Sequence, residues 1–339
     1  MLAALGILAV PPERAAYAQT TSFKLVWSGD ISPPTNETKG DDYATSEIVL
    51  KEHPDLVCTA GDDQYETGTY SMFASPVGFD GSWGRVKGLT KCPAVGNHDV
   101  ADPGAGAPGF RQYFSGVLNG LLCQSDPVPC HPERGYYVVD LDVDRNGQQD
   151  WFITILDSDC GRAGGGTGDV ETPSCTDNGE QANWLRAVYN ARHGGQTSGR
   201  KCSLAIWHHE RWGTGFFADD PATQYLWNVV NHYHGDVVLS GHTHSVARLG
   251  PMTPTGSLSS TGAGIRQITA GAGGRSLTAN RVNPARTGTR YRNNTLYGVN
   301  RLVLTSSASS AGWLTGSWTS SFIFTNGTVA DAASAGCWV

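Results

Sequence analysis

The sequence predicts an α/β fold built around a parallel β-sheet. Five short apolar runs are each followed closely by glycine or polar residues, which is the pattern of buried strands that open into loops. A helical pattern separates the first two runs, and strand, helix and strand in that order form a βαβ unit with parallel strands. The five predicted strands are Phe23–Trp27, Asp55–Thr59, Cys92–Val95, Cys202–Ile206 and Asp236–Ser240.

The helices are predicted from apolar spacing and from residues that end a helix. Residues 42–53 carry apolar side chains at helical intervals before the break at Pro54. Residues 66–91 have a mixed helical character, whereas residues 100–134 are dense in glycine and proline and are predicted to form a loop. Two further amphipathic helices are predicted at residues 180–192 and 221–234.

A hairpin is predicted in the middle of the chain. Residues 136–142 and 150–156 alternate as two strands around Asn146-Gly147, a pair typical of a tight type I′ turn. The same stretch resembles the start of a calcium loop, with Asp142, Asp144, Asn146 and Gly147 in the spacing of such loops. The closing position holds Ile153 instead of Glu, and this favours a plain hairpin.

The remaining strands are short and lie in a region rich in Gly, Ser and Thr. They are predicted at residues 265–270, 302–305 and 321–324. No linker separates two compositions and no repeat is visible. Residues 19–339 are therefore predicted to form one domain.

Composition limits the classes of function. Hydrophobic residues make up 39% of the chain and charged residues 16%, and the net charge is −7. No basic stripe with interleaved aromatics is present, which argues against binding of a nucleic-acid duplex. A small phosphorylated ligand is compatible with this charge because metal ions can supply the positive charge that side chains lack. The sequence carries no signal for an oligomeric state.

The start of the chain and its cysteines predict a secreted or periplasmic protein. An apolar run over residues 1–10 precedes Ala16-Tyr17-Ala18, a small-x-small cleavage pattern, so residues 1–18 are predicted to be a signal peptide. Ten apolar residues are too few to span a membrane. Eight cysteines without a CxxC pair suit disulfides in an oxidising compartment. The predicted pairs are Cys123–Cys130, Cys160–Cys175, Cys202–Cys337 and Cys58–Cys92, although spacing alone does not determine connectivity.

Potential metal ligands follow all five predicted strands. In open α/β sheets, ligands bind at the loops outside the carboxyl ends of the strands. Mixed oxygen and nitrogen donors suit Zn, Mn or Fe better than Ca or Mg. The sequence thus predicts a site for two metal ions, which a carboxylate such as Asp62 can bridge. The five motifs are Gly29-Asp30-Ile31-Ser32, Gly61-Asp62-Asp63-Gln64-Tyr65, Gly96-Asn97-His98-Asp99, Trp207-His208-His209-Glu210 and Gly241-His242-Thr243-His244.

These motifs resemble the calcineurin-like metallophosphoesterase superfamily, whose blocks run D-x-H, G-D, G-N-H-D/E, an isolated H and G-H-x-H. Two positions depart from that pattern. Ser32 stands where the superfamily has His, and Tyr65 follows Asp62 by three residues. Loss of that His together with gain of that Tyr is typical of the purple acid phosphatase variant. The resemblance covers most of residues 23–250.

The resemblance implies a fold, a ligand set and roles for single residues. The implied fold is a sandwich of two mixed β-sheets flanked by helices. Fe(III) is expected at metal 1, because phenolate is a hard anionic donor, with Zn, Mn or Fe(II) at metal 2. His98 is expected to contact the phosphate oxygens or protonate the leaving group, and Asn97 and His209 are further candidate substrate contacts. The implied ligands are Asp30, Tyr65 and His244 for metal 1, Asn97, His208 and His242 for metal 2, and Asp62 as the bridge.

The predicted reaction is hydrolysis of phosphate monoesters by attack of a metal-bound hydroxide. Two cations about 3.5–4 Å apart can clamp the ester and stabilise the attacking and leaving oxygens. One alternative is a phosphodiesterase that acts on nucleotides or lipid headgroups. Another is a secreted metal-binding protein without turnover. The absence of a GxSxG motif weakens a serine-esterase interpretation.

Overall fold

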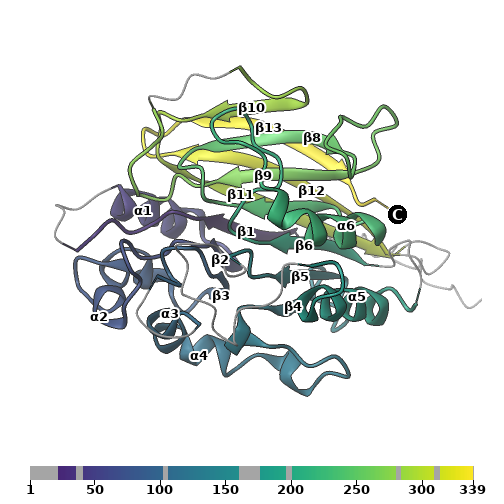
Figure 1. Ribbon diagram of the computed structural model, residues 1–339, viewed down its shortest axis with the longest axis horizontal. Helices are drawn as coiled ribbons and strands as arrows, with labels where there is room; N and C mark the ends of the chain where they lie inside the picture. Colours follow the sequence, from purple (N-terminus) through teal and green to yellow (C-terminus); the bar gives the residue numbers. More distant parts are fainter. Residues whose placement is uncertain are drawn as a thin grey trace, which may run out of the picture.

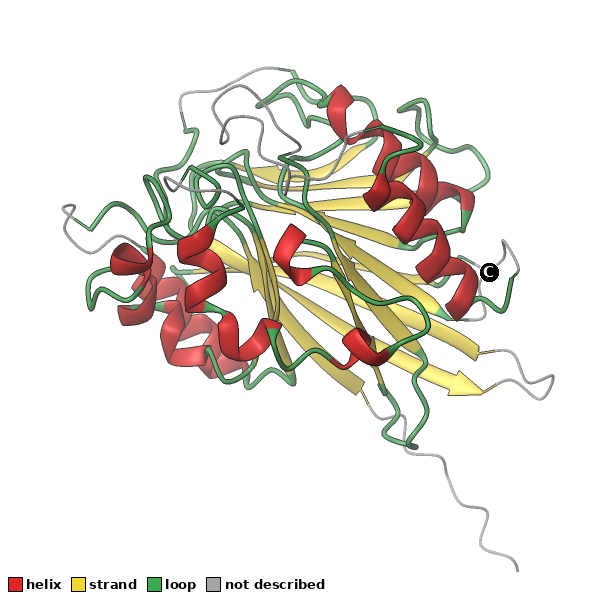
Figure 2. Cartoon of the chain, turned by 60° about the horizontal axis from the view of Figure 1, so that its bottom comes forward, coloured by secondary structure: helices red, strands yellow, loops and turns green. Residues whose placement is uncertain are grey.

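The computed structural model describes residues 22–35, 41–101, 106–159, 176–195, 201–279, 284–308 and 314–338. The predicted signal peptide and the predicted Cys160–Cys175 pair lie outside these residues. Two β-sheets are stacked on each other, and helices flank them on both sides (Figures 1 and 2). In the described part of the chain, no helix has both the length and the apolar character needed to cross a membrane.

The first sheet has six strands in the order β13-β12-β11-β1-β2-β3. Strands β1, β2 and β3 are parallel, whereas β11 runs antiparallel to β1. This sheet therefore combines the predicted parallel βαβ unit with an antiparallel C-terminal extension. Its strands are β1 (Ser22–Ser28), β2 (Leu56–Ala60), β3 (Thr90–Ala94), β11 (Gly298–Ala308), β12 (Leu314–Phe324) and β13 (Val329–Gly336).

The second sheet has seven strands in the order β10-β8-β9-β7-β6-β5-β4. Its centre, β5-β6-β7-β9, is parallel, and β4, β8 and β10 are added antiparallel. The expected pair of mixed sheets is confirmed. The strands are β4 (Tyr137–Leu141), β5 (Trp151–Ile155), β6 (Cys202–Ile206), β7 (Val237–Ser240), β8 (Val246–Met252), β9 (Ile265–Ala270) and β10 (Thr289–Asn293).

Most predicted helices are present, and one predicted loop is partly helical. The helices are α1 (Asp42–Glu52), α2 (Tyr70–Phe73), α3 (Pro108–Tyr113), α4 (Ser115–Leu118), α5 (Glu180–Arg192) and α6 (Gln224–His232). Residues 100–134 were expected to be a loop, yet they contain α3 and α4. Pro108 starts α3 at a position that tolerates proline. Phe110 and Phe114 then pack with Phe73 of α2, and this aromatic contact stabilises the short helices.

The predicted hairpin is present, but its turn is not the predicted type I′ turn. Leu141 pairs with Trp151, so residues 142–150 connect the two strands. The positive φ angles fall on Arg145 (58°) and Gly147 (86°) and not on two successive residues. Asp142 accepts hydrogen bonds from the backbone N–H groups of Asn146 and Gly147. These side-chain bonds wind the chain into a wider loop than the Asn-Gly pair alone would form.

Three of the predicted disulfides are present. Cys58–Cys92 joins β2 to β3, and Cys123–Cys130 closes a short loop. Cys202–Cys337 joins β6 of the second sheet to the segment after β13 of the first sheet. This last bond therefore links the two layers of the sandwich.

We expect the Cys202–Cys337 bond to stabilise the protein more than the Cys123–Cys130 bond. The first closes a separation of 135 residues and the second a separation of 7. In the chain-entropy view, this difference is worth about 2–3 kcal/mol in the free energy of unfolding. Guanidinium unfolding of the Cys202→Ser/Cys337→Ser and Cys123→Ser/Cys130→Ser variants measures it. Equal losses would contradict the prediction.

Candidate metal centre

The five motif-bearing loops meet where the carboxyl ends of strands from both sheets come together. Gly29, after β1, donates its N–H to Ala270 O of β9 at 2.8 Å. Asp30 N–H donates to Gly61 O at 3.0 Å, and Gly241 N–H donates to His208 O at 3.0 Å. Backbone hydrogen bonds therefore connect these loops both within and between the sheets. Side chains on them are held by rigid elements.

Several predicted ligands have an unfavourable backbone conformation. The φ angles are 55° at Asp30, 52° at Asp62, 69° at His242 and 45° at His244. Positive φ is uncommon for residues other than glycine, and it persists only where surrounding contacts enforce it. Backbone strain of this kind clusters at functional sites.

Glycine permits the close approach of these loops. A Cβ atom on Gly96 would lie 2.2 Å from both the backbone N and the Oδ1 of Asp62. A Cβ atom on Gly61, where φ is 83°, would lie 2.6 Å from His208 Nδ1. A side chain at either position would displace a predicted ligand, so the glycines in these motifs have a steric role.

The donors expected for metal 1 converge on the Tyr65 hydroxyl. Tyr65 Oη lies 2.8 Å from Asp30 Oδ1, 2.9 Å from Asp62 Oδ2 and 3.0 Å from His244 Nε2. Tyr65 is only 1% exposed, and the two carboxylates are equally buried. A phenol, two carboxylates and an imidazole are thus within hydrogen-bond distance of one oxygen atom.

The donors expected for metal 2 lie beside this cluster. His208 Nε2 is 3.2 Å from Asn97 Oδ1 and 3.2 Å from Asp62 Oδ2. The rings of His208 and His242 are 5.1 Å apart. Asp62 therefore contacts both sets of donors, as a bridging ligand must. This mixture of oxygen and nitrogen donors fits a pair of Zn, Mn or Fe ions.

The sequence matches the calcineurin-like phosphoesterase family over residues 23–246, which include all five motifs. The chain belongs to this family. No curated protein sequence matches the chain.

Solved structures share the fold at low sequence identity. A purple acid phosphatase from yellow lupin (Lupinus luteus) seeds has a TM-score of 0.60 and 16% identity, over 94% of this chain and 54% of that one. This chain thus spans about half the length of the plant enzyme. PhoD gives a TM-score of 0.52 at 13% identity, over 93% of this chain and 68% of that one. GAP50, the anchor in the inner membrane complex of Plasmodium, gives a TM-score of 0.53 at 11% identity, over 94% of this chain and 89% of that one.

Hydrogen bonds orient the imidazoles of this family member. His208 Nδ1 lies 2.8 Å from Ala60 O, and His244 Nδ1 lies 2.6 Å from Ser276 O. Both rings therefore carry a proton on Nδ1 and present Nε2 to the donor cluster. The Asp99 carboxylate accepts N–H groups of Gly96 (2.9 Å) and Asp63 (3.1 Å) and so joins two of the motif loops.

The electrostatics of the cluster favour cations. Burial, followed by the Asp30 and Asp62 carboxylates, raises the pKa of the Tyr65 phenol well above its ordinary value. Burial also works against a charged Asp62, yet His208 holds the pKa of this carboxyl below its ordinary range. Burial opposes a charged His208 as well, but Asp62 raises its pKa to about 10. Metal ions bound by Tyr65 and His208 would displace their protons, so metal binding would be coupled to proton release.

His98 lies beside the cluster, in a group that includes an arginine not predicted from the sequence. His98 Nδ1 is 2.7 Å from Glu66 O and 3.5 Å from Glu66 Oε2. Arg275 Nη2 donates to Glu66 Oε1 at 2.6 Å, and its guanidinium lies 5.0 Å from the centre of the Tyr65 ring. Arg275 follows a glycine-rich turn after β9. Arg275 therefore lies beyond the carboxyl end of β9, which is a place where ligands bind in open α/β sheets.

His209 is buried and does not lie at the protein surface. It is 3% exposed, and its Nδ1 lies 3.0 Å from Ser158 Oγ. Donor atoms of His208, His209 and His242 all come within 4.8 Å of one another. Its expected contact with substrate stays a prediction, and the ring packs directly against proposed ligands of metal 2.

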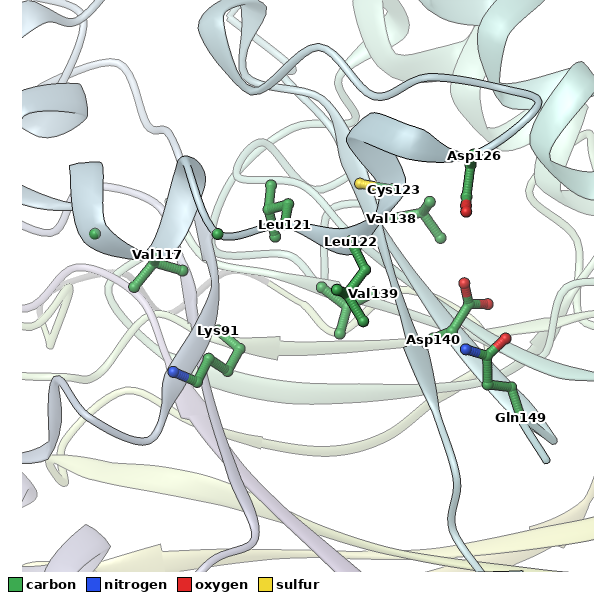
Figure 3. Close-up of a pocket in the computed structure, with 12 residues that line it drawn as sticks. Lys91, Val117, Leu121, Leu122, Cys123, Asp126, Val138, Val139, Asp140 and Gln149 are labelled. Atoms are coloured by element: carbon green, nitrogen blue, oxygen red, sulfur yellow. The ribbon is translucent and has the colours of Figure 1, made fainter. Parts of the chain in front are cut away.

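A separate hollow of about 390 Å³ lies between α4 and β4 (Figure 3). Lys91, Val117, Leu122 and Val138 are among its walls. It contains none of the predicted metal or substrate residues. This hollow therefore lacks the donor set on which phosphate-ester chemistry depends.

We expect Gly96→Ala to disrupt the metal centre. The new Cβ would meet the Asp62 backbone and carboxylate at 2.2 Å, so the proposed bridging ligand must shift. Metal affinity should fall by about 10–100-fold, the usual effect of misorienting a ligand. Gly88→Ala is a matched control because its Cβ would meet nothing within 4 Å. Metal analysis after dialysis checks this, and full metal content in Gly96→Ala would contradict it.

Proposed function

We propose that this protein is a dimetal phosphatase that hydrolyses phosphate monoesters. The observation that carries the proposal is the convergence of Asp30, Asp62 and His244 on the Tyr65 hydroxyl within 3.0 Å. Membership of the calcineurin-like phosphoesterase family supports a hydrolase that acts on phosphoester bonds.

The proposed metal ligands divide into two sets that share Asp62. Asp30, Tyr65 and His244 would hold Fe(III), since a phenolate is a hard anionic donor. Zn, Mn or Fe(II) would occupy the second position. When bound, the two ions would supply positive charge and lower the pKa of a water. The ligands of the second set are Asn97, His208 and His242.

The chain's own residues would bind and orient the ester. His98 is held through Nδ1 by the Glu66 carbonyl, so Nε2 is the nitrogen left for a phosphate oxygen or a leaving group. The Asp62 carboxylate accepts the His98 backbone N–H at 2.7 Å, which ties this residue to the proposed bridging ligand. Asn97 and His209 remain candidate substrate contacts.

Arg275 favours monoesters over diesters. A phosphate monoester carries up to two negative charges, whereas a diester carries one, so a fixed cation at the site binds the monoester more strongly. The Arg275 side chain is 19% exposed beside His98 and Tyr65, and the Glu66 carboxylate holds its position. No observation of comparable weight supports a diesterase for nucleotides or lipid headgroups.

We expect Arg275→Gln to lower kcat/KM for a monoester more than for a diester. Loss of a hydrogen bond to a charged group costs about 1.5–3 kcal/mol, which is roughly a 10–100-fold decrease. The substrates are 4-nitrophenyl phosphate and bis(4-nitrophenyl) phosphate, which release the same chromophore. Arg275→Lys keeps the charge and should retain part of the preference. Higher wild-type activity on the bis-ester would instead support the phosphodiesterase alternative.

Tyr65→Phe tests the metal assignment. A ferric ion bound by the Tyr65 phenolate should give a broad visible absorption band, and the variant should lose the band together with iron. Absorption spectroscopy and metal analysis of the same non-reduced sample measure both. A colourless wild-type protein with two Zn or Mn ions would contradict Fe(III) at metal 1. A fully metallated protein without turnover would support the non-catalytic alternative.

We also propose that the protein acts in an oxidising compartment, secreted or periplasmic. The three disulfides support this, because such bonds are rare in reducing compartments.

Residues 19–339 are proposed to form a single domain. A small phosphorylated molecule is the proposed substrate.

A further inference from the structure

The loop between β4 and β5 lies away from the metal centre. Strand β5 runs parallel to β6 and β7, whose carboxyl ends carry His208 and His242. Residues 142–150 precede β5 and therefore lie at the opposite end of these parallel strands. Neither the proposed metal centre nor the proposed reaction uses this loop.

The spacing of oxygen donors in the loop is that of a calcium site. EF-hand loops take oxygen ligands from positions 1, 3, 5, 7 and 9, with the backbone carbonyl at 7 and glycine at 6. Ile153 at position 12 argued against such a site. Position 9, however, is an aspartate that provides another carboxylate within the loop. The residues at positions 1, 3, 5, 6, 7 and 9 are Asp142, Asp144, Asn146, Gly147, Gln148 and Asp150.

The backbone of the loop is folded around its acidic residues. Asp142 Oδ1 accepts the Asn146 N–H at 3.0 Å, and Asp142 Oδ2 accepts the Gly147 N–H at 2.8 Å. Gly147 has a φ of 86°, a conformation that glycine adopts without strain. The Asp142 carboxylate is thus held on the inner side of the loop. The Asp144 carboxylate accepts the Asn146 backbone N–H at 3.2 Å and the Asn146 side-chain amide at 2.8 Å.

An independent observation at Asp150 points to a cation. This residue is 2% exposed, and its Oδ1 accepts the Val143 N–H at 2.8 Å, which places the carboxyl group inside the loop. Its Oδ2 is buried and has no hydrogen-bond partner among the described residues. A buried carboxylate oxygen without a partner is costly unless a cation or a donor compensates it.

Among the described residues, no basic side chain forms an ion pair with Asp150. Arg145, within the loop, turns to Asp55 and pairs with it at 2.8 Å. Lys201 attracts Asp150 electrostatically, but the two form no ion pair in the described structure. The loop thus holds three carboxylates, and Lys201 acts on Asp150 only from beyond ion-pair distance.

We propose that the β4–β5 loop binds one Ca²⁺ ion. The ligands are the side-chain oxygens of Asp142, Asp144, Asn146 and Asp150 and the carbonyl of Gln148. Oxygen-only donors select a hard cation over the metals proposed for the catalytic centre. The carboxylates of Asp142, Asp144 and Asp150 are not among the described groups whose donor atoms lie within 4.8 Å of one another. We therefore expect calcium binding to draw the loop together.

Calorimetric titration of the full, metal-loaded protein with CaCl₂ tests the proposal. We expect one calcium ion to bind with a Kd of about 10⁻⁴–10⁻³ M, as in extracellular calcium modules. Asp150→Asn and Asp142→Asn should each weaken binding by at least about tenfold, because affinity follows the charge of the ligands. Asp177→Asn is the matched control, since Asp177 is exposed and lies outside the loop.

Asn146→Asp provides a test in which the expected result is a gain of calcium affinity, which loss of folding cannot produce. It adds a charged ligand at position 5 and should tighten calcium binding by roughly tenfold. Contraction of the loop should also slow tryptic cleavage after Arg145, whose side chain is 61% exposed. Asp30→Asn, in the proposed metal centre, should leave this calcium ion bound. Failure of millimolar calcium to bind, or unchanged binding in Asp150→Asn, Asp142→Asn and Asn146→Asp, would overturn the proposal.

Discussion

The structure depends on one electrostatic constraint, which is the burial of acidic groups around the Tyr65 hydroxyl. Asp30 and Asp62 approach this oxygen to within 2.9 Å, and all three residues are buried. Carboxylate oxygens of Asp30 and Asp62 lie within 4.8 Å of one another. Like charges this close repel strongly in a medium of low dielectric constant, so cations or protons must compensate them. The positive φ angles, the close-packed glycines and the hydrogen bonds to the imidazoles all serve to hold these donors in place. The fold accepts local strain in order to concentrate charge.

Two sheets make that concentration feasible. One parallel sheet presents its carboxyl ends along a line, whereas two packed sheets bring donors in from two sides. Asp30, Asp62 and Asn97 come from the loops of the first sheet, and His208, His242 and His244 come from those of the second. The sheets are joined by the Gly29–Ala270 hydrogen bond near the site and by the Cys202–Cys337 bond. The relative position of the two sheets therefore determines the distance between the two sets of proposed ligands.

Local signals could be predicted from the sequence, whereas long-range partners could not. Each strand-end motif spans only a few residues, so its glycines and metal donors could be predicted from the local sequence. The packing of two sheets was predicted from the family resemblance. The predicted type of the hairpin turn was wrong because hydrogen bonds to the Asp142 side chain outweigh the preference of Asn146-Gly147 for a type I′ turn. The position of Arg275 after a strand could be predicted, but its pairing with Glu66, 209 residues away in the sequence, could not. The helices after Pro108 were missed because aromatic contacts with α2 stabilise them.

The fold alone does not decide whether the protein turns over a substrate. The similar structures include a plant purple acid phosphatase and a Plasmodium anchor protein, both at identities that establish only the fold. What distinguishes the possibilities is the chemistry of the donors at the sheet edges. Imidazole, amide, carboxylate and phenol meet at one edge, and this mixture suits metals that activate water. The opposite edge offers oxygen donors alone, which suit a structural cation that orders a hairpin without taking part in chemistry. Donor type thus separates the two proposed roles more sharply than topology does.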